Sequence, residues 1–136
     1  MQPWIENISR EDIARGLHYD AGDNSMLIQL TDPDCEHPPS AMKFKEVRQY
    51  KFLDIEDTDI VKHKWAITHE QAKSLADDLR FAYNNHMNVV VHCHMGICRS
   101  GAVVECGVMI GFMDTERFRA PNLMVKHKIM HHLGML

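Results

Sequence analysis

Residues 88–113 form an almost unbroken apolar stretch that one short polar loop divides in two, and this stretch limits the possible folds most strongly. The first part, NVVVH (88–92), is short and β-branched, which indicates a buried strand. The second part, SGAVVECGVMIGFM (100–113), is small or apolar on nearly every side, as expected of a buried helix. A strand and a helix that are both buried need covering elements around them, which predicts a layered α/β arrangement.

The rest of the chain alternates between strand and helix patterns. MLIQL and VRQYKFL are typical of strands, and the apolar residues between 69 and 84 recur at helical spacing. In chain order we expect a helix over 10–17, strands over 26–30 and 47–53, a helix over 69–84, and then the strand and the helix described above. A last helix should follow, with Pro121 in its first turn and an apolar stripe of Val125, Ile129, Met130 and Leu133. This order predicts an α/β fold, a single compact domain with a mainly parallel central sheet flanked by helices.

Two helix starts are marked by the spacing of capping residues. Ser9 with Asp12 and Thr68 with Gln71 have the spacing of a capping box, in which each side chain satisfies a free backbone N–H at the helix start. The helices should therefore begin directly after Ser9 and Thr68.

Length, charge and cysteine content narrow the class of protein. The 136 residues fit one domain, 1–136, and the net charge of -4 gives no basic field that would recruit nucleic acid. No apolar run approaches the roughly 18 residues of a membrane span, and MQPWIENISR lacks the layout of a signal peptide. The four cysteines have no regular disulfide spacing. We therefore expect a cytoplasmic protein with free thiols and no membrane or nucleic-acid partner, while its oligomeric state stays open.

The C-terminal part carries four cations, Arg117, Arg119, Lys126 and Lys128, and no acid. Two interpretations remain open, a local anion-facing surface and a solvated helix face, of which we favour the second.

The polar loop HCHMGICRS (92–100) runs from the end of the predicted strand to the start of the predicted helix. Ligands of open α/β sheets bind at the carboxyl ends of strands, and a helix N-terminus attracts anions. Cys93 in this position would react as a thiolate near neutral pH. Arg99 would hold two phosphoryl oxygens in a bidentate fork. Gly96 would let successive backbone N–H groups converge on one oxyanion. Ser100 would donate a hydrogen bond to the thiolate, and His92 would pack below the loop and orient it. This pattern favours nucleophilic attack on a phosphate ester.

His92, Cys93, HMGIC, Arg99 and Ser100 resemble the Cys-x5-Arg motif of the cysteine-dependent protein tyrosine and dual-specificity phosphatases. MLIQLTDPD, YKFLDIED, ITHEQAK and RAPNLMVKH are similar to segments of the compact bacterial and phage members of this superfamily. The resemblance implies the dual-specificity-like fold, no cofactor and no metal, a phosphorylated protein or peptide as partner, Cys93 as nucleophile and Ser100 as its helper. It also implies a substrate-binding loop formed by His94, Met95, Gly96, Ile97, Cys98 and Arg99.

The resemblance further implies an aspartate on a separate loop, which protonates the leaving oxygen and then activates water. The acidic segment after strand 47–53 offers Asp54, Asp57 and Asp59. Asp54 fits the pattern of the compact bacterial members, and Asp57 fits the typical dual-specificity pattern. We favour Asp54, with Asp57 second and Asp59 third.

Other chemistries also use such a loop. His92, Cys93, His94 and Cys98 are possible zinc ligands, although the paired spacing of structural zinc sites is missing. A sulfur transferase-like enzyme, a non-catalytic phosphate-binding module, and a phosphatase for RNA 5′-ends or phosphoinositides stay as alternatives. Cys98 is either a partner for disulfide exchange with Cys93 or a small side chain packed under the loop.

Overall fold

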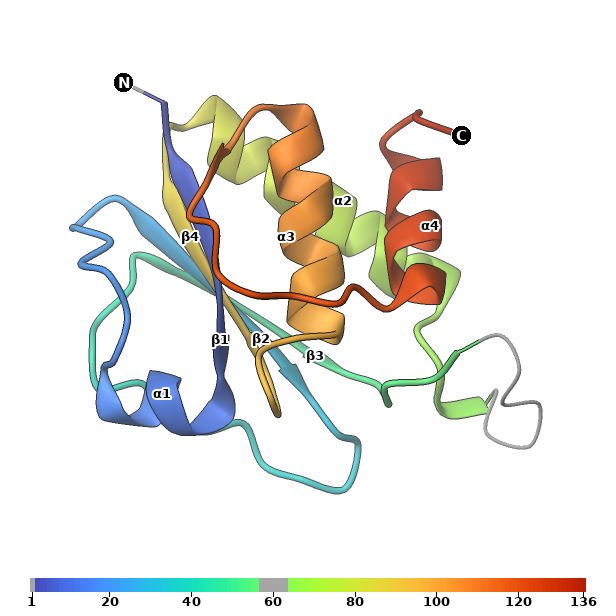
Figure 1. Ribbon diagram of the computed structural model, residues 1–136, viewed down its shortest axis with the longest axis horizontal. Helices are drawn as coiled ribbons and strands as arrows, with labels where there is room; N and C mark the ends of the chain where they lie inside the picture. The colour runs from blue at the N-terminus through green and yellow to red at the C-terminus, as the bar shows by residue number, and fades with distance from the viewer. Residues whose placement is uncertain (1, 57–63) are drawn as a thin grey trace.

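A computed structural model describes residues 2–56 and 64–136 and contains four helices and five strands in these ranges (Figure 1). The elements are β1 (Trp4–Ser9), α1 (Arg10–Arg15), β2 (Ser25–Thr31), β3 (Glu46–Lys51), α2 (His69–Asn84), β4 (Asn88–Cys93), α3 (Arg99–Ile110), β5 (Met113–Asp114) and α4 (Leu123–His132). The strands form one sheet in the order β3-β2-β4-β1-β5, and every neighbouring pair is parallel. The predicted α/β class with a parallel sheet flanked by helices is confirmed.

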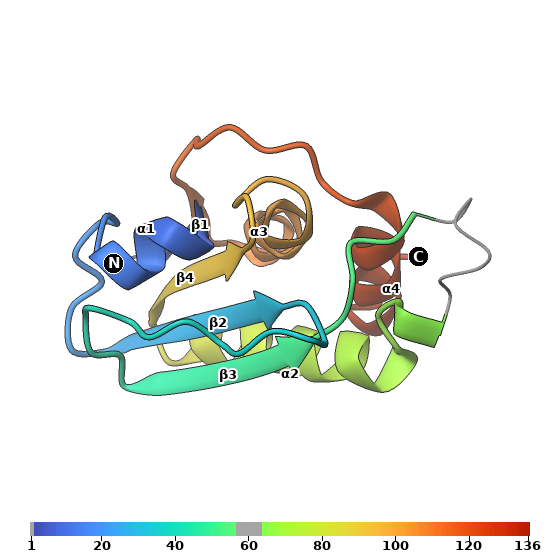
Figure 2. The same cartoon turned by 90° about the horizontal axis from the view of Figure 1, so that it is seen from below.

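Successive residues of a strand point to opposite faces of the sheet, and apolar strand residues on both faces pack against helices. Met26 and Ile28 of β2 pack in the main core with residues of α2, α3 and α4, whereas Leu27 packs in a second, smaller cluster with Ile13 of α1. Figure 1 shows α1 on the side of the sheet away from the other three helices. Figure 2 shows the arrows of β2 and β3 pointing the same way, so their carboxyl ends meet at one edge of the sheet.

Strand β1 lies inside the sheet, between β4 and β5, and the sequence analysis did not predict it. Its residues Glu6 and Asn7 interrupt the apolar alternation, although both side chains are buried. Glu6 forms an ion pair with Arg117 at 2.6 Å, and Asn7 donates hydrogen bonds to the carbonyl oxygens of Gly96 and Phe118. These polar residues are tolerated inside the sheet because each has a partner supplied by a distant part of the chain.

The predicted helix starts are confirmed at both capping sites. Ser9 accepts a hydrogen bond from the Asp12 N–H, and Thr68 and Gln71 form the reciprocal capping box of α2, whose bounds agree with the prediction. The prediction for the last helix was wrong in one detail. Pro121 lies outside the first turn of α4, because Asn122 is the N-cap and accepts from the Val125 N–H.

The C-terminal cations are bound within the molecule. Arg117 pairs with Glu6, Arg119 pairs with Glu105 and Asp114, Lys126 pairs with Glu105, and Lys128 donates to the Ile67 carbonyl. These contacts give no support to an anion-facing surface there. In the part of the chain that the structure describes, none of the helices has the length and apolar character needed to cross a bilayer.

Candidate active site

The loop between β4 and α3 is held from outside through its carbonyl oxygens. The donors are the Arg10 N–H to His94 at 3.1 Å, the Asn7 side chain to Gly96 at 2.8 Å, the Ala120 N–H to Ile97 at 3.2 Å and the Asn122 N–H to Cys98 at 3.0 Å. In contrast, the N–H groups of residues 95–98 donate no hydrogen bond within residues 2–56 and 64–136. Amides left free beside a helix N-terminus can bind the oxygens of an anion, as the sequence pattern predicts.

Gly96 is required by the close packing of this loop on β1. Its φ of 75° lies in the left-handed region, and a Cβ atom there would be 2.3 Å from the Ile8 carbonyl carbon and 2.5 Å from the Ser9 nitrogen. Since both neighbours are backbone atoms, they cannot turn aside as a flexible side chain would. The loop can therefore approach β1 this closely only with glycine at position 96.

We expect Gly96→Ala to lower the free energy of unfolding by more than the ~1–2 kcal/mol that a left-handed backbone alone costs a non-glycine residue. It should also weaken vanadate binding, because the loop must shift to relieve the contact with β1. Gly22→Ala is the matched control, since Gly22 has a φ of 78° and an added Cβ would meet no atom within 4 Å. Urea unfolding and vanadate titration of both variants check this, and equal losses in the two would contradict it.

Cys93 and Ser100 are paired side chains at the bottom of the loop. Cys93 ends β4, Ser100 lies in the first turn of α3, and the Cys93 Sγ is 3.1 Å from the Ser100 Oγ. Both residues are buried in the protein, yet Cys93 lines two adjoining hollows that also share Asp32, His94 and Arg99. The arrangement places a thiol within reach of a small ligand and gives it one hydroxyl partner.

Arg99 is anchored on one side of its guanidinium group. Its Nη1 donates to the Asp32 carboxylate and to the Phe52 carbonyl oxygen, both at 2.7 Å, and the other guanidinium nitrogens donate no hydrogen bond within residues 2–56 and 64–136. The Nε–Nη2 edge is therefore left for a bidentate contact with two phosphoryl oxygens. The carbonyl of Asp32 accepts a hydrogen bond from the Cys35 N–H, and the contact of its carboxylate with Arg99 was not predicted from the sequence.

Asp54 faces the same hollow as Cys93 and Arg99. It follows β3, its side chain is exposed, and its Oδ1 accepts a hydrogen bond of 2.6 Å from the Asn122 side chain. The structure thus brings Cys93, Ser100, Arg99 and Asp54 to one site. Asp57 and Asp59, the other two candidates for the acid, lie outside the described residues.

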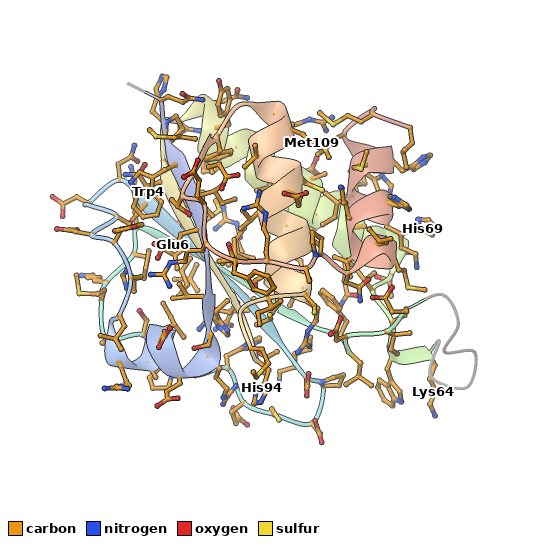
Figure 3. The ribbon with its side chains drawn as sticks, in the orientation of Figure 1. Trp4, Glu6, Lys64, His69, His94 and Met109 are labelled. Atoms are coloured by element: carbon orange, nitrogen blue, oxygen red, sulfur yellow. The ribbon has the colours of Figure 1, made fainter. Side chains whose placement is uncertain are left out.

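The variable positions of the loop differ in exposure. Met95 is 65% exposed, and Ile97 and Cys98 are half-buried. His94 is exposed and lies near the lower edge of the view in Figure 3. Burial, with the nearby Asp54 carboxylate, raises the pKa of the Cys98 thiol. Its disulfide exchange with Cys93 stays a prediction. Cys106, by contrast, is a core residue of α3, and burial raises its pKa to about 12.

The two histidines beside Cys93 point to different environments, since His92 is buried and His94 is exposed. Among the described residues, the cluster of His, Cys and carboxylate atoms close enough to share a metal ion consists of Asp32, Asp34 and Cys35 and includes no residue of the predicted zinc set. His92 is buried, and neither ring nitrogen has a hydrogen-bond partner of normal geometry among the described residues. Its role in orienting the loop stays a prediction.

Burial lowers the pKa of His92 to about 4 from an ordinary value of 6.5. Between these two pH values the unfolded chain binds a proton at this residue and the folded protein does not, so stability should fall as pH drops from 6.5 to about 4. The full effect amounts to about 3 kcal/mol. Urea unfolding at several pH values should show a shallower fall for His92→Gln than for the unchanged protein. An identical pH dependence in the two would contradict this assignment.

The fold and the site together define an α/β protein with a Cys-x5-Arg loop between a central strand and a buried helix. No protein-family model matches the chain. No curated protein matches it either. Eleven chains of solved structures are similar to it, among them one described as "Crystal structure of Tk-PTP in the active form". That chain is 15% identical, with a TM-score of 0.47 over 97% of this chain and 80% of its own length. A likeness this distant assigns no activity, and the fold class rests on the strand order itself.

Proposed function

We propose that this chain is a cysteine-dependent phosphatase that hydrolyses phosphotyrosine, and phosphoserine or phosphothreonine, in cytoplasmic proteins. The observation that carries the proposal is that Cys93, Arg99 and Asp54 line one hollow, while the Ser100 hydroxyl lies 3.1 Å from the Cys93 thiol. Cys93, Arg99 and Ser100 share one loop and the helix turn after it, whereas Asp54 comes from the distant segment after β3, so its place beside them is not a consequence of sequence neighbourhood.

In the first step the free edge of Arg99 and the loop amides bind the phosphoryl oxygens. The Cys93 thiolate attacks phosphorus, so that a sulfur–phosphorus bond forms while the ester bond breaks, and Asp54 donates its proton to the departing oxygen. In the second step Asp54 takes a proton from a water molecule as this water attacks phosphorus. The sulfur–phosphorus bond then breaks, inorganic phosphate leaves, and Ser100 donates a hydrogen bond to the released thiolate.

The alternatives differ in what they require of the site. Sulfur transfer needs no proton donor for a leaving alcohol or phenol, whereas the site has a carboxylate, Asp54, beside the thiol and Arg99. A non-catalytic phosphate-binding module needs neither Cys93 nor Asp54. The phosphatase proposal gives each of these residues a role, and a side-by-side assay of phosphopeptides, RNA 5′-phosphates and phosphoinositides would identify the preferred substrate.

Hydrolysis of an aryl phosphate should continue in excess EDTA and should be inhibited competitively by vanadate. The reason is that Arg99 and the loop amides, rather than a metal ion, are proposed to stabilise the charge that develops in the transition state. Steady-state assays with and without EDTA check the first statement, and inhibition at several substrate concentrations checks the second. If activity disappears on chelation and returns with zinc, the proposal is wrong.

A further inference from the structure

We propose that Asn122 is a positioning residue that holds Asp54 at the site and fixes which carboxylate oxygen delivers the proton. This inference rests on the proposed function. Sequence analysis gave Asn122 no role, because it lies 68 positions from Asp54 and directly before a helix, where asparagine is a common cap.

Asn122 forms hydrogen bonds to three segments, which are the segment after β3, the start of α4 and the loop before α3. Its side chain is 0% exposed, and its Nδ2 donates to the Asp54 Oδ1 at 2.6 Å and to the Ile55 carbonyl at 3.1 Å. Its backbone N–H donates to the Cys98 carbonyl in the loop at 3.0 Å. Its Oδ1 accepts from the Val125 N–H at the start of α4. One buried side chain thus connects the segment after β3 to α4, and its backbone connects both to the loop that carries the nucleophile.

The direction of the hydrogen bond decides the position of the proton on Asp54. An amide Nδ2 can only donate, so the Oδ1 atom that it contacts must accept. A proton on this oxygen would weaken the bond, because the hydroxyl oxygen of a carboxylic acid is a poorer acceptor than its carbonyl oxygen. In its acidic form Asp54 therefore carries the proton on Oδ2, and the donor oxygen is fixed before a substrate binds.

Two functions of Asn122 lie on different atoms and can be separated by mutation. The cap of α4 uses Oδ1 as an acceptor, whereas the contact with Asp54 uses Nδ2 as a donor. Serine caps a helix about as well as asparagine does, but its shorter side chain cannot reach Asp54. Alanine removes both contacts. The backbone N–H that binds the Cys98 carbonyl is present in the unchanged protein and in both variants.

The experiment compares Asn122→Ser and Asn122→Ala on a phosphotyrosyl peptide and on p-nitrophenyl phosphate. Both variants should lower kcat on the peptide by about 10–100-fold, the size expected for a misplaced catalytic group, and should lower it less on the ester with the better leaving group. KM and vanadate affinity should change little, since the phosphate ligands remain.

Stability and a double mutant separate this role from a structural one. Unfolding in urea should show a larger loss of stability for Asn122→Ala than for Asn122→Ser. Thr68→Ala, which removes the cap of α2, should lose stability without any dependence on the leaving group. In an Asp54→Asn background, Asn122→Ser should lower kcat no further on the peptide, because the group it positions is already absent.

Two results would overturn the inference while the proposed phosphatase function stands. One is an Asn122→Ser enzyme that keeps the kcat of the unchanged protein on both substrates. The other is an Asn122→Ser enzyme whose kcat falls by the same factor on both substrates. An unchanged protein that hydrolyses neither substrate would instead refute the proposed function itself, so the two failures are distinguishable.

Discussion

Cys93→Ser should abolish turnover of an aryl phosphate while vanadate or phosphate still binds. The proposed reaction passes through a sulfur–phosphorus bond, and a serine hydroxyl in the same place is a far weaker nucleophile near neutral pH because it stays protonated. The expected loss in kcat is roughly 10⁴–10⁶-fold, as for other enzymes that lose their nucleophile. Arg99 and the loop amides are unchanged, so isothermal titration should show anion binding within a few-fold of the original affinity.

The remaining cysteines supply the controls for this result. Cys35 is exposed and Cys106 is buried in the core, so neither belongs to the proposed reaction even though Cys35 lines a hollow beside Cys93. Cys35→Ser should keep most of the activity. Iodoacetate at about pH 6.5 should modify Cys93 much faster than these two thiols, because burial raises the pKa of Cys106, and desolvation together with the Asp34 carboxylate raises the pKa of Cys35. Equal alkylation rates for all cysteines, or full activity in Cys93→Ser, would exclude the mechanism.

Asp54→Asn should lower kcat on a phosphotyrosyl peptide by roughly 10²–10⁴-fold, the usual contribution of a general acid. The loss should be smaller on p-nitrophenyl phosphate, provided that cysteine phosphorylation limits the rate, because p-nitrophenolate leaves without needing a proton. The alkaline limb of the pH profile should disappear, since it reports loss of the acid's proton. Binding of vanadate should change little, because Arg99 remains anchored by Asp32 and the Phe52 carbonyl.

Asp57→Asn is the comparison that decides between the two aspartates. If Asp54 is the acid, the Asp57 variant should show neither the dependence on the leaving group nor the altered pH profile. The pattern matters more than the size of the loss, since residues three positions apart could support each other's hydrogen bonds. If the Asp57 variant shows the dependence on the leaving group and the Asp54 variant does not, their roles are exchanged. If neither variant shows it, Asp59 is the next residue to test.

Much of the fold was predictable because its signals are local. The β-branched run of β4, the all-round apolar character of α3 and the capping pairs at Ser9 and Thr68 each lie within a few residues. Strand β1 was missed because its signal is not local. Glu6 and Asn7 are buried in this strand with Arg117 and Gly96 as partners more than 80 positions away, and no short window of sequence contains both members of either pair.

In the candidate site, too, the residues that lie close together in the sequence were predictable. Cys93, Arg99 and Ser100 share one loop, so their spacing alone indicated their chemistry. Asp32 and Asn122 were missed because their partners are distant in sequence, Arg99 for the first and Asp54 for the second. One general signal was available for Asp32. It follows β2, a neighbour of β4, and the carboxyl ends of adjacent parallel strands meet at one edge of a sheet.

The central place of β1 has a consequence for how the protein is made. This strand is synthesised before its sheet partners, which are β4, beginning at Asn88, and β5, beginning at Met113. At about 5–20 residues per second of synthesis, β1 waits several seconds before its first partner exists. During that time Glu6 has no Arg117 and Asn7 has no Gly96. The loop proposed to bind phosphate is therefore completed only after β5 and Arg117 have been translated, so a nascent chain that stops before β5 should have no activity.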